Sequence, residues 1–178
     1  MCRLHLWTLK EGITALSICE IILLKCLGEK GSEKIDDVLV RFEEETLKYG
    51  FIGRSLFINT LKSLKLQGFI RLRRVKPTII KVELNKHLKE KHNLPEILKK
   101  EIEKRTDGLK PEVFRKILDA TELLSVKEND YVRLDKLKNA LQRCGVSEKE
   151  FNKALKKLLE WGFIYKLSPN LIKTVKPP

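Results

Sequence analysis

Two stretches of this chain repeat one pattern in the same register and without a gap. Residues 57 to 70 read FINTLKSLKLQGFI, and residues 151 to 164 read FNKALKKLLEWGFI. In both, apolar residues recur at i, i+4 and i+7, which places them on one face of a helix. A glycine follows at the point where a left-handed residue would end that helix. Two copies are too few for a solenoid, so the repeat predicts tandem domains.

Each repeat runs directly into the pattern of a β-hairpin. In the first, residues 69–75 and 79–84 read as strands on either side of the turn Lys76-Pro77-Thr78. In the second, residues 164–167 and 171–175 form a shorter hairpin of the same kind. A helix that stops at glycine and continues into a hairpin is typical of the recognition helix and wing of a winged helix-turn-helix.

Upstream of the first repeat, the sequence predicts two further helices. The run from Ile13 to Leu27 is apolar nearly all round, which indicates one largely buried helix ended by Gly28. We expect Ser32 to cap the next helix and Ser55 to cap the recognition helix. Between them, residues 50–53 (Gly-Phe-Ile-Gly) read as the turn of the helix-turn-helix.

The second unit is predicted to follow the same plan. Pro111 opens its first helix, Tyr131-Val132 forms a short strand, and a second helix ends at Cys144-Gly145. Ser147 and Glu150 have the spacing of a capping box, which indicates the start of the second recognition helix.

The segment between the units, residues 85–110, is charged and reads as a helical linker. Asn93 and Pro95 fit the start of a helix with a narrow apolar stripe, which would make the linker semi-rigid. The sequence therefore predicts a mainly α fold with small β-hairpins (α+β). Its tandem winged helices would occupy residues 1–84 and 111–178, with the helical linker between them.

The net charge of +13 indicates a polyanionic partner, and its distribution is uneven. From Thr46 to Leu84 there are nine lysines and arginines against one acid, Glu83. The acids of this half lie mostly earlier, as in Glu43-Glu44-Glu45. So many uncompensated cations repel one another unless a polyanion covers them.

The first recognition helix presents side chains that can read bases or bind phosphates. Opposite its apolar stripe lie Asn59, Lys62 and Ser63, with Thr60 at the flank. Asn can pair bidentately with adenine, and Lys binds phosphate or guanine; the alternative is a merely solvated face. The predicted DNA-binding residues of the first unit are Arg54, Asn59, Lys62, Ser63, Arg71, Arg73, Arg74, Lys76 and Lys81.

The second recognition helix is basic in a different way. Its first turn holds Glu148 and Glu150, which suit the helix dipole but would lie near phosphates if this end docked into a groove. The candidate DNA-binding residues of the second unit are Lys149, Lys153, Lys156, Lys157 and Lys166. We therefore expect the first unit to dominate DNA contact, while the second could bind DNA or protein.

Residues 34–84 resemble the C-terminal winged-helix domain of archaeal origin-recognition initiators. The resemblance rests on the helix KIDDVLVRFEEETLKYG, the recognition-helix end LKLQGFI and the wing that closes on IKVEL. It implies contact with origin DNA through helix and wing. Residues 136–175, with GVSEKEFNKALKKLLEWGFIYKLSPNLIKTV, resemble the small C-terminal winged helix of archaeal minichromosome-maintenance helicases. Each resemblance covers less than a third of the chain.

Both of these families carry an ATPase module, and this sequence departs from them there. It has no GxxxxGK[ST] phosphate loop and no room for such a module, so ATP-driven loading or unwinding is not implied. Abundant Lys, Glu, Ile and Leu with only two Gln are typical of a thermophile.

The sequence excludes several other classes. The apolar run around residues 18–27 contains Glu20 and Lys25 and is too short for a membrane span. The N-terminus lacks the apolar core and cleavage site of a signal peptide. No Ser/His/Asp arrangement indicates an enzyme, and we expect Cys19 and Cys26 to be buried thiols. The remaining cysteines and histidines, at positions 2, 5, 87, 92 and 144, show no metal-ligand spacing.

These observations favour a non-enzymatic protein that binds double-stranded DNA without a cofactor. Its role would be a transcription regulator or a DNA-replication accessory factor, in the cytoplasm and associated with the nucleoid. Protein partners would then come from replication or transcription. The alternative is a tandem winged-helix scaffold that binds protein, as in chromosome-segregation or membrane-remodelling adaptors. The basic wing argues against it, because such adaptors need no concentrated positive charge.

Overall fold

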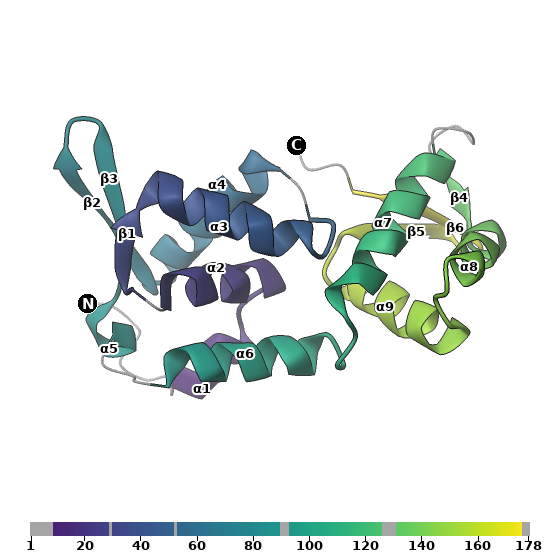
Figure 1. The fold of residues 1–178 in the computed structure, drawn as a ribbon, viewed down its shortest axis with the longest axis horizontal. Helices are drawn as coiled ribbons and strands as arrows, with labels where there is room; N and C mark the ends of the chain where they lie inside the picture. Colours follow the sequence, from purple (N-terminus) through teal and green to yellow (C-terminus); the bar gives the residue numbers. More distant parts are fainter. Residues whose placement is uncertain (1–8, 29, 52, 90–92, 126–130, 176–178) are drawn as a thin grey trace. The chain divides into compact units, whose positions relative to one another are not determined.

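The computed structural model describes residues 9–175 apart from residues 29, 52, 90–92 and 126–130 (Figure 1). The chain is an α+β protein with two small antiparallel sheets of three strands each, and it divides into two compact units. Met1–Thr46 and Ile52–Lys104 form the first unit, and Leu47–Phe51 and Arg105–Pro178 form the second. The prediction of a mainly helical fold with small hairpins is confirmed at this level.

The first unit combines helices with a sheet of order β1-β3-β2. Its elements are α1 (Leu9–Thr14), α2 (Ile18–Gly28), β1 (Ser32–Lys34), α3 (Ile35–Leu47), α4 (Arg54–Leu66), β2 (Ile70–Lys76), β3 (Ile79–Leu84), α5 (Lys86–Lys89) and α6 (Leu94–Arg105). Both strands of the first hairpin are paired antiparallel across the predicted turn.

The second unit has a sheet of order β4-β6-β5. Its elements are α7 (Pro111–Ser125), β4 (Val132–Arg133), α8 (Leu134–Arg143), α9 (Glu148–Glu160), β5 (Ile164–Ser168) and β6 (Leu171–Thr174). From α2 and from α7 onward, both units run helix, strand, helix, helix, strand, strand, and the first strand pairs with the last. The repeat seen in the sequence therefore extends to the topology of both units.

The core of the first unit is built where the apolar periodicity placed it. Phe57, Leu61 and Leu64 of α4 are buried, and Leu64 is fully enclosed. Helix α2 is buried nearly all round and packs against α4 and β3. The inner face of the sheet contributes Ile70 and Val82. These contacts fix which face of α4 points outward.

The prediction of a single helix over residues 13–27 is wrong, because the helix is interrupted before Ser17. There the Ser17 amide donates to Glu20 Oε2 over 2.6 Å, and the Glu20 amide donates to Ser17 Oγ over 3.3 Å. This reciprocal arrangement is a capping box, which starts a new helix and satisfies backbone donors that would otherwise lack partners. The Ser-x-x-Glu spacing was visible in the sequence.

Two other predicted caps are also wrong. Ser32 lies in β1, where it pairs with Glu83 of β3, so its backbone is part of the sheet and does not start the helix. Ser55 lies inside α4, whose N-cap is Gly53 with no side-chain cap. Gly53 has φ 137°, a conformation that side chains disfavour, and its carbonyl accepts the Leu56 amide.

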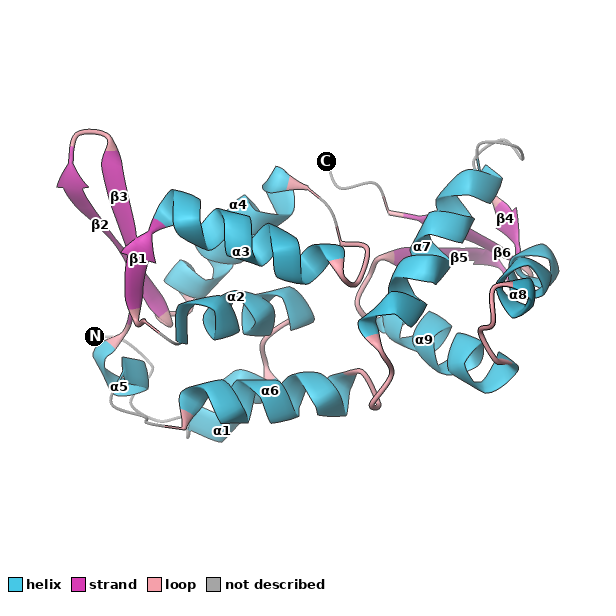
Figure 2. Ribbon diagram, in the orientation of Figure 1, coloured by secondary structure: helices cyan, strands magenta, loops and turns pink. Residues whose placement is uncertain are grey.

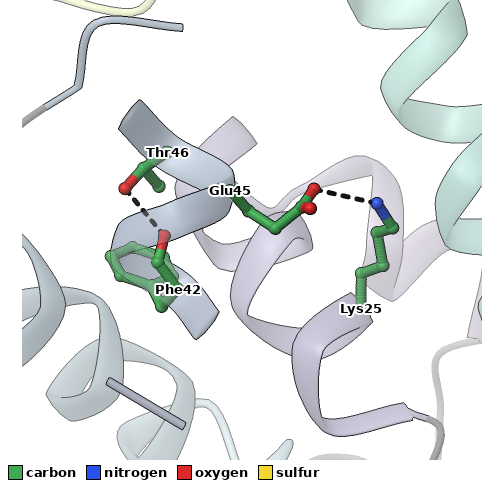
Figure 3. A network of polar contacts seen from close by, with 4 residues as sticks. All are labelled: Lys25, Phe42, Glu45 and Thr46. Carbon is green, nitrogen blue, oxygen red and sulfur yellow. Dashed lines mark hydrogen bonds and ion pairs between the residues drawn. The ribbon is translucent and has the colours of Figure 1, made fainter. Parts of the chain in front are cut away.

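Helix α3 is joined to α2 by an ion pair (Figure 3). Lys25 Nζ lies 3.0 Å from Glu45 Oε2. In the last turns of α3, the buried Thr46 hydroxyl donates to the Phe42 carbonyl over 2.8 Å. The hydroxyl thus finds a partner inside the core, which avoids the cost of an unsatisfied polar group.

The prediction of a separate linker at residues 85–110 is wrong for most of its length. Leu88, Leu94 and Leu98 are buried, and the first compact unit extends to Lys104. In α6, Leu94 and Leu98 are buried while Ile97 is exposed, so part of its apolar stripe packs within the first unit. The predicted start is confirmed, since α6 begins after Asn93, whose carbonyl accepts the Ile97 amide.

Residues 47–51, which run from the last residue of α3 toward α4, belong to the second unit. The Phe51 ring stacks on Phe163, with centroids 3.8 Å apart and an interplanar angle of 1°. Tyr49 and Trp161 extend the same aromatic cluster. A Cβ on Gly50 would lie 3.1 Å from the Arg115 Cα. Gly50 and Phe51 of the predicted turn are therefore also part of the second core.

The cysteine prediction is confirmed for Cys19 and Cys26, which are buried free thiols, while Cys144 is exposed. Burial, together with the nearby Glu20 carboxylate, raises the pKa of Cys19 to about 12. Among the described residues, no helix has both the length and the apolar character needed to cross a bilayer.

Candidate nucleic-acid interface

The outer face of α4 presents polar and basic side chains in a fixed orientation. Because Phe57, Leu61 and Leu64 anchor the inner face, Asn59 and Lys62 point outward, and both are exposed. They lie three residues apart, so they are neighbours on the helix surface. Arg54, also exposed, is the first residue of the helix.

Ser63 does not face outward as predicted. It is half-buried, and its hydroxyl donates to Glu20 Oε1 over 2.6 Å. The same oxygen accepts from Gln67 Nε2 over 2.7 Å. Thr60, placed at the flank of the outer face, is buried. Glu20 therefore ties the end of α4 to α2, and because it lies 43 residues from Ser63, no local signal predicted the contact.

The β2–β3 hairpin carries most of the remaining predicted residues. In Figure 2 it extends away from the helices of the first unit. Arg71, Arg73, Arg74 and Lys76 of β2 are exposed, while Lys81 of β3 is half-buried. In the part of the chain that the structure describes, none of these five side chains forms an ion pair or a hydrogen bond.

The sheet brings a residue that the sequence analysis missed into this surface. Lys34 of β1 lies directly opposite Lys81, and Lys81 lies directly opposite Arg73. We call these three residues the cation row. Lys34 was overlooked because β1 has only three residues and no usable periodicity, and its pairing with β3 spans much of the unit. Only the strand register shows the alignment.

The basic residues of the second unit lie in a different electrostatic environment. Lys149, Lys153 and Lys166 are exposed. Lys157 is largely covered, and its Nζ lies 3.4 Å from Glu160 Oε2 and 3.8 Å from an Asp107 carboxylate oxygen. Acids of this unit therefore lie close to its predicted contact surface. Lys156, also exposed, lies 3.9 Å from the same Glu160.

The first turn of α9 is closed by the predicted capping box. The Ser147 hydroxyl accepts from the Glu150 amide, and Glu150 accepts from the Ser147 amide and hydroxyl. These hydrogen bonds from Ser147 lower the pKa of the Glu150 carboxyl. The N-terminal amides of α9 are thus partly satisfied within the protein.

The second sheet has no counterpart of the cation row. At the equivalent register, Arg133 of β4 lies opposite Leu171, and Leu171 lies opposite Ser168. Arg133 Nε and Nη2 donate to the two Asp135 carboxylate oxygens over 3.1 and 2.8 Å. These hydrogen bonds lower the pKa of Asp135. The one cation in this row is therefore already paired.

Within the described residues, no group of three His, Cys, Asp or Glu side chains is arranged to hold a metal ion. Of the residues considered for such a site, Cys2, His5 and His92 lie outside the described residues. Comparisons of the chain with protein-family models, with curated proteins and with solved structures give no match.

Proposed function

We propose that this chain is a double-stranded DNA-binding protein made of tandem winged helices, and that its first unit makes the main DNA contact. The observation that carries the proposal is the set of cations on the β2–β3 hairpin that have no acid partner among the described residues, beside the basic outer face of α4. Cations that no acid compensates favour a polyanionic partner. The element order and the sheet order of both units support the winged-helix assignment.

In this proposal, α4 enters the major groove and the hairpin follows the DNA backbone. Asn59 is the residue suited to read a base, because its amide can pair bidentately with adenine. Arg71, Arg73 and Arg74 are long enough to reach phosphates or the minor groove, where they position the protein rather than read sequence. Ser63 is left out of the contact set because its hydroxyl is bonded to Glu20.

The biological role that fits this chemistry is regulation of transcription or assistance in DNA replication, without catalysis. In this proposal the chain binds DNA, and its protein partners come from either process. The resemblance of residues 34–84 to initiator winged helices supports the replication role.

A direct test is binding to a labelled duplex of about 20 base pairs, followed by fluorescence anisotropy at several salt concentrations. Several phosphate contacts should give a linear fall of log K with log salt, with a slope of about −0.9 per contact. A preparation that is folded by circular dichroism but has no affinity for duplex at low salt would contradict the proposal.

A further inference from the structure

We propose that the cation row of Lys34, Lys81 and Arg73 is a phosphate-binding site in its own right, on the outer face of the β1-β3-β2 sheet. It would take backbone phosphates of the duplex. The inference deepens the proposed function and rests on it. It also extends the interface beyond α4 and the hairpin to β1, which lies next to β3 in this sheet (Figure 1).

The strand register defines the geometry of the row. Lys34 pairs with Lys81 and Lys81 pairs with Arg73, so all three side chains leave the same face of the sheet. Directly opposite residues have Cβ atoms about 4.5–5.5 Å apart. Successive residues in a strand alternate faces, and Val82, the neighbour of Lys81, is fully buried. The row therefore lies on the outer face.

The acids near the row do not neutralise it. Glu33, next to Lys34, is buried on the inner face, where it pairs with Lys30 over 2.9 Å and with Arg41. The neighbouring cross-strand row does contain an acid, because Arg71 lies opposite Glu83. Asp36 and Asp37, at the start of α3, form no ion pair with the cation row among the described residues.

Three adjacent like charges repel one another in the free protein and attract an anion that bridges them. Like charges directly opposite across strands destabilise a sheet. A phosphate removes that repulsion by accepting from the lysine ammonium groups and from the planar guanidinium of Arg73. Neutralising one member should therefore stabilise the free protein and weaken duplex binding, two effects of opposite sign.

The test compares Lys34→Gln with Lys100→Gln, which makes the same charge change at an exposed position of α6 in the same unit. For Lys34→Gln, we expect the salt slope to shrink by about 0.9, and the affinity at about 0.1 M salt to fall roughly eightfold, as for one lost phosphate contact. Its Tm at low salt should rise by about 1–5 °C. Lys100→Gln should change neither quantity, and Lys34→Arg should retain both wild-type values.

Thermal unfolding with and without inorganic pyrophosphate separates the two proposals. If wild type binds duplex but Lys34→Gln behaves like Lys100→Gln in both affinity and Tm, the proposal that the cation row binds phosphate is contradicted and the proposed function stands. If wild type binds no duplex, yet pyrophosphate raises its Tm more than that of Lys34→Gln, the row is an anion site and the proposed function fails. Absence of both effects overturns both.

Discussion

The two units share an element order and a sheet order, but they differ in whether the basic residues of their sheets are paired with acids. In the first sheet, one cross-strand row holds Lys34, Lys81 and Arg73, with no acid partner among the described residues. At the same register in the second sheet, a leucine and a serine replace two of the cations, and the remaining Arg133 is bound to Asp135. A duplicated fold therefore does not imply a duplicated surface.

Helices α4 and α9, which occupy equivalent places in the two units, also differ in the charges and caps at their N-termini. Helix α4 begins at Arg54 after the N-cap Gly53, with no side-chain cap and no acid in its first turn. Helix α9 begins with a complete capping box and carries Glu148 and Glu150 in its first turn. Acids and a cap suit the positive end of a helix dipole when that end stays in water. An uncapped end without acids is compatible with an approaching phosphate.

The largest expected effect concerns the core of the second unit, which includes the separate segment 47–51. Phe51 is buried and stacks on Phe163, so Phe51→Ala should lower the free energy of unfolding of this unit by about 3–5 kcal/mol. Urea unfolding in a Trp7→Phe background, monitored by the fluorescence of Trp161, measures it.

The control for Phe51→Ala is Tyr165→Ala, which removes an exposed ring from the same unit. It should shift the urea midpoint far less. Equal midpoints for the two variants would mean that residues 47–51 are not part of the second core.

A second prediction concerns base recognition by the first unit. Asn59→Ala should cost about 1–3 kcal/mol of binding free energy on a preferred site selected from a random duplex pool, and much less on random duplex. The equivalent change in the second unit, Lys153→Ala, should weaken both duplexes by the same small factor. If Asn59→Ala instead reduces binding to both duplexes equally, α4 does not read bases.

A smaller effect separates the two helix starts. Ser147→Ala should destabilise the second unit by roughly 0.5–2 kcal/mol, because Ser147 caps α9. Ser55→Ala, at the residue wrongly predicted to cap α4, should stay within about 0.5 kcal/mol of wild type. Chemical unfolding of both variants measures the difference. A loss for Ser55→Ala as large as that for Ser147→Ala would contradict the assigned caps.

The same cap has a pH signature. The pKa of Glu150 is lower in the folded protein than its ordinary value of 4.5, so the carboxylate contributes stability above pH 4.5 that is lost as the pH falls through the folded pKa. The stability difference between wild type and Ser147→Ala should therefore shrink below pH 4.5. A difference that is constant down to the folded pKa would rule out this linkage.

Features with a local signal in the sequence were predicted well. The inner face of α4, the hairpin turn after β2 and the capping box of α9 each depend on residues close together in the chain. The break before Ser17 had such a signal too, but the strong apolar character of the surrounding run obscured it.

Features that depend on distant residues were missed. Ser63 was expected to face outward because only its helical position was known, whereas the acceptor of its hydrogen bond, Glu20, comes from another helix. Lys34 joined the basic surface only through the register of β1. Likewise, the sequence around Phe51 does not reveal that its ring belongs to the second core.

The central claim is that the first unit supplies most of the cations that hold the DNA backbone. The most direct measurement compares duplex affinity and salt slope for two triple variants, each checked for folding by circular dichroism. One replaces Arg71, Arg73 and Arg74 with Gln, and the other replaces Lys149, Lys153 and Lys166 with Gln. The first should reduce the salt slope by about 2.7 and the affinity at about 0.1 M salt by roughly several hundredfold, as for three lost contacts. The second should lose less than about one contact, and a larger loss for the second variant would contradict the account.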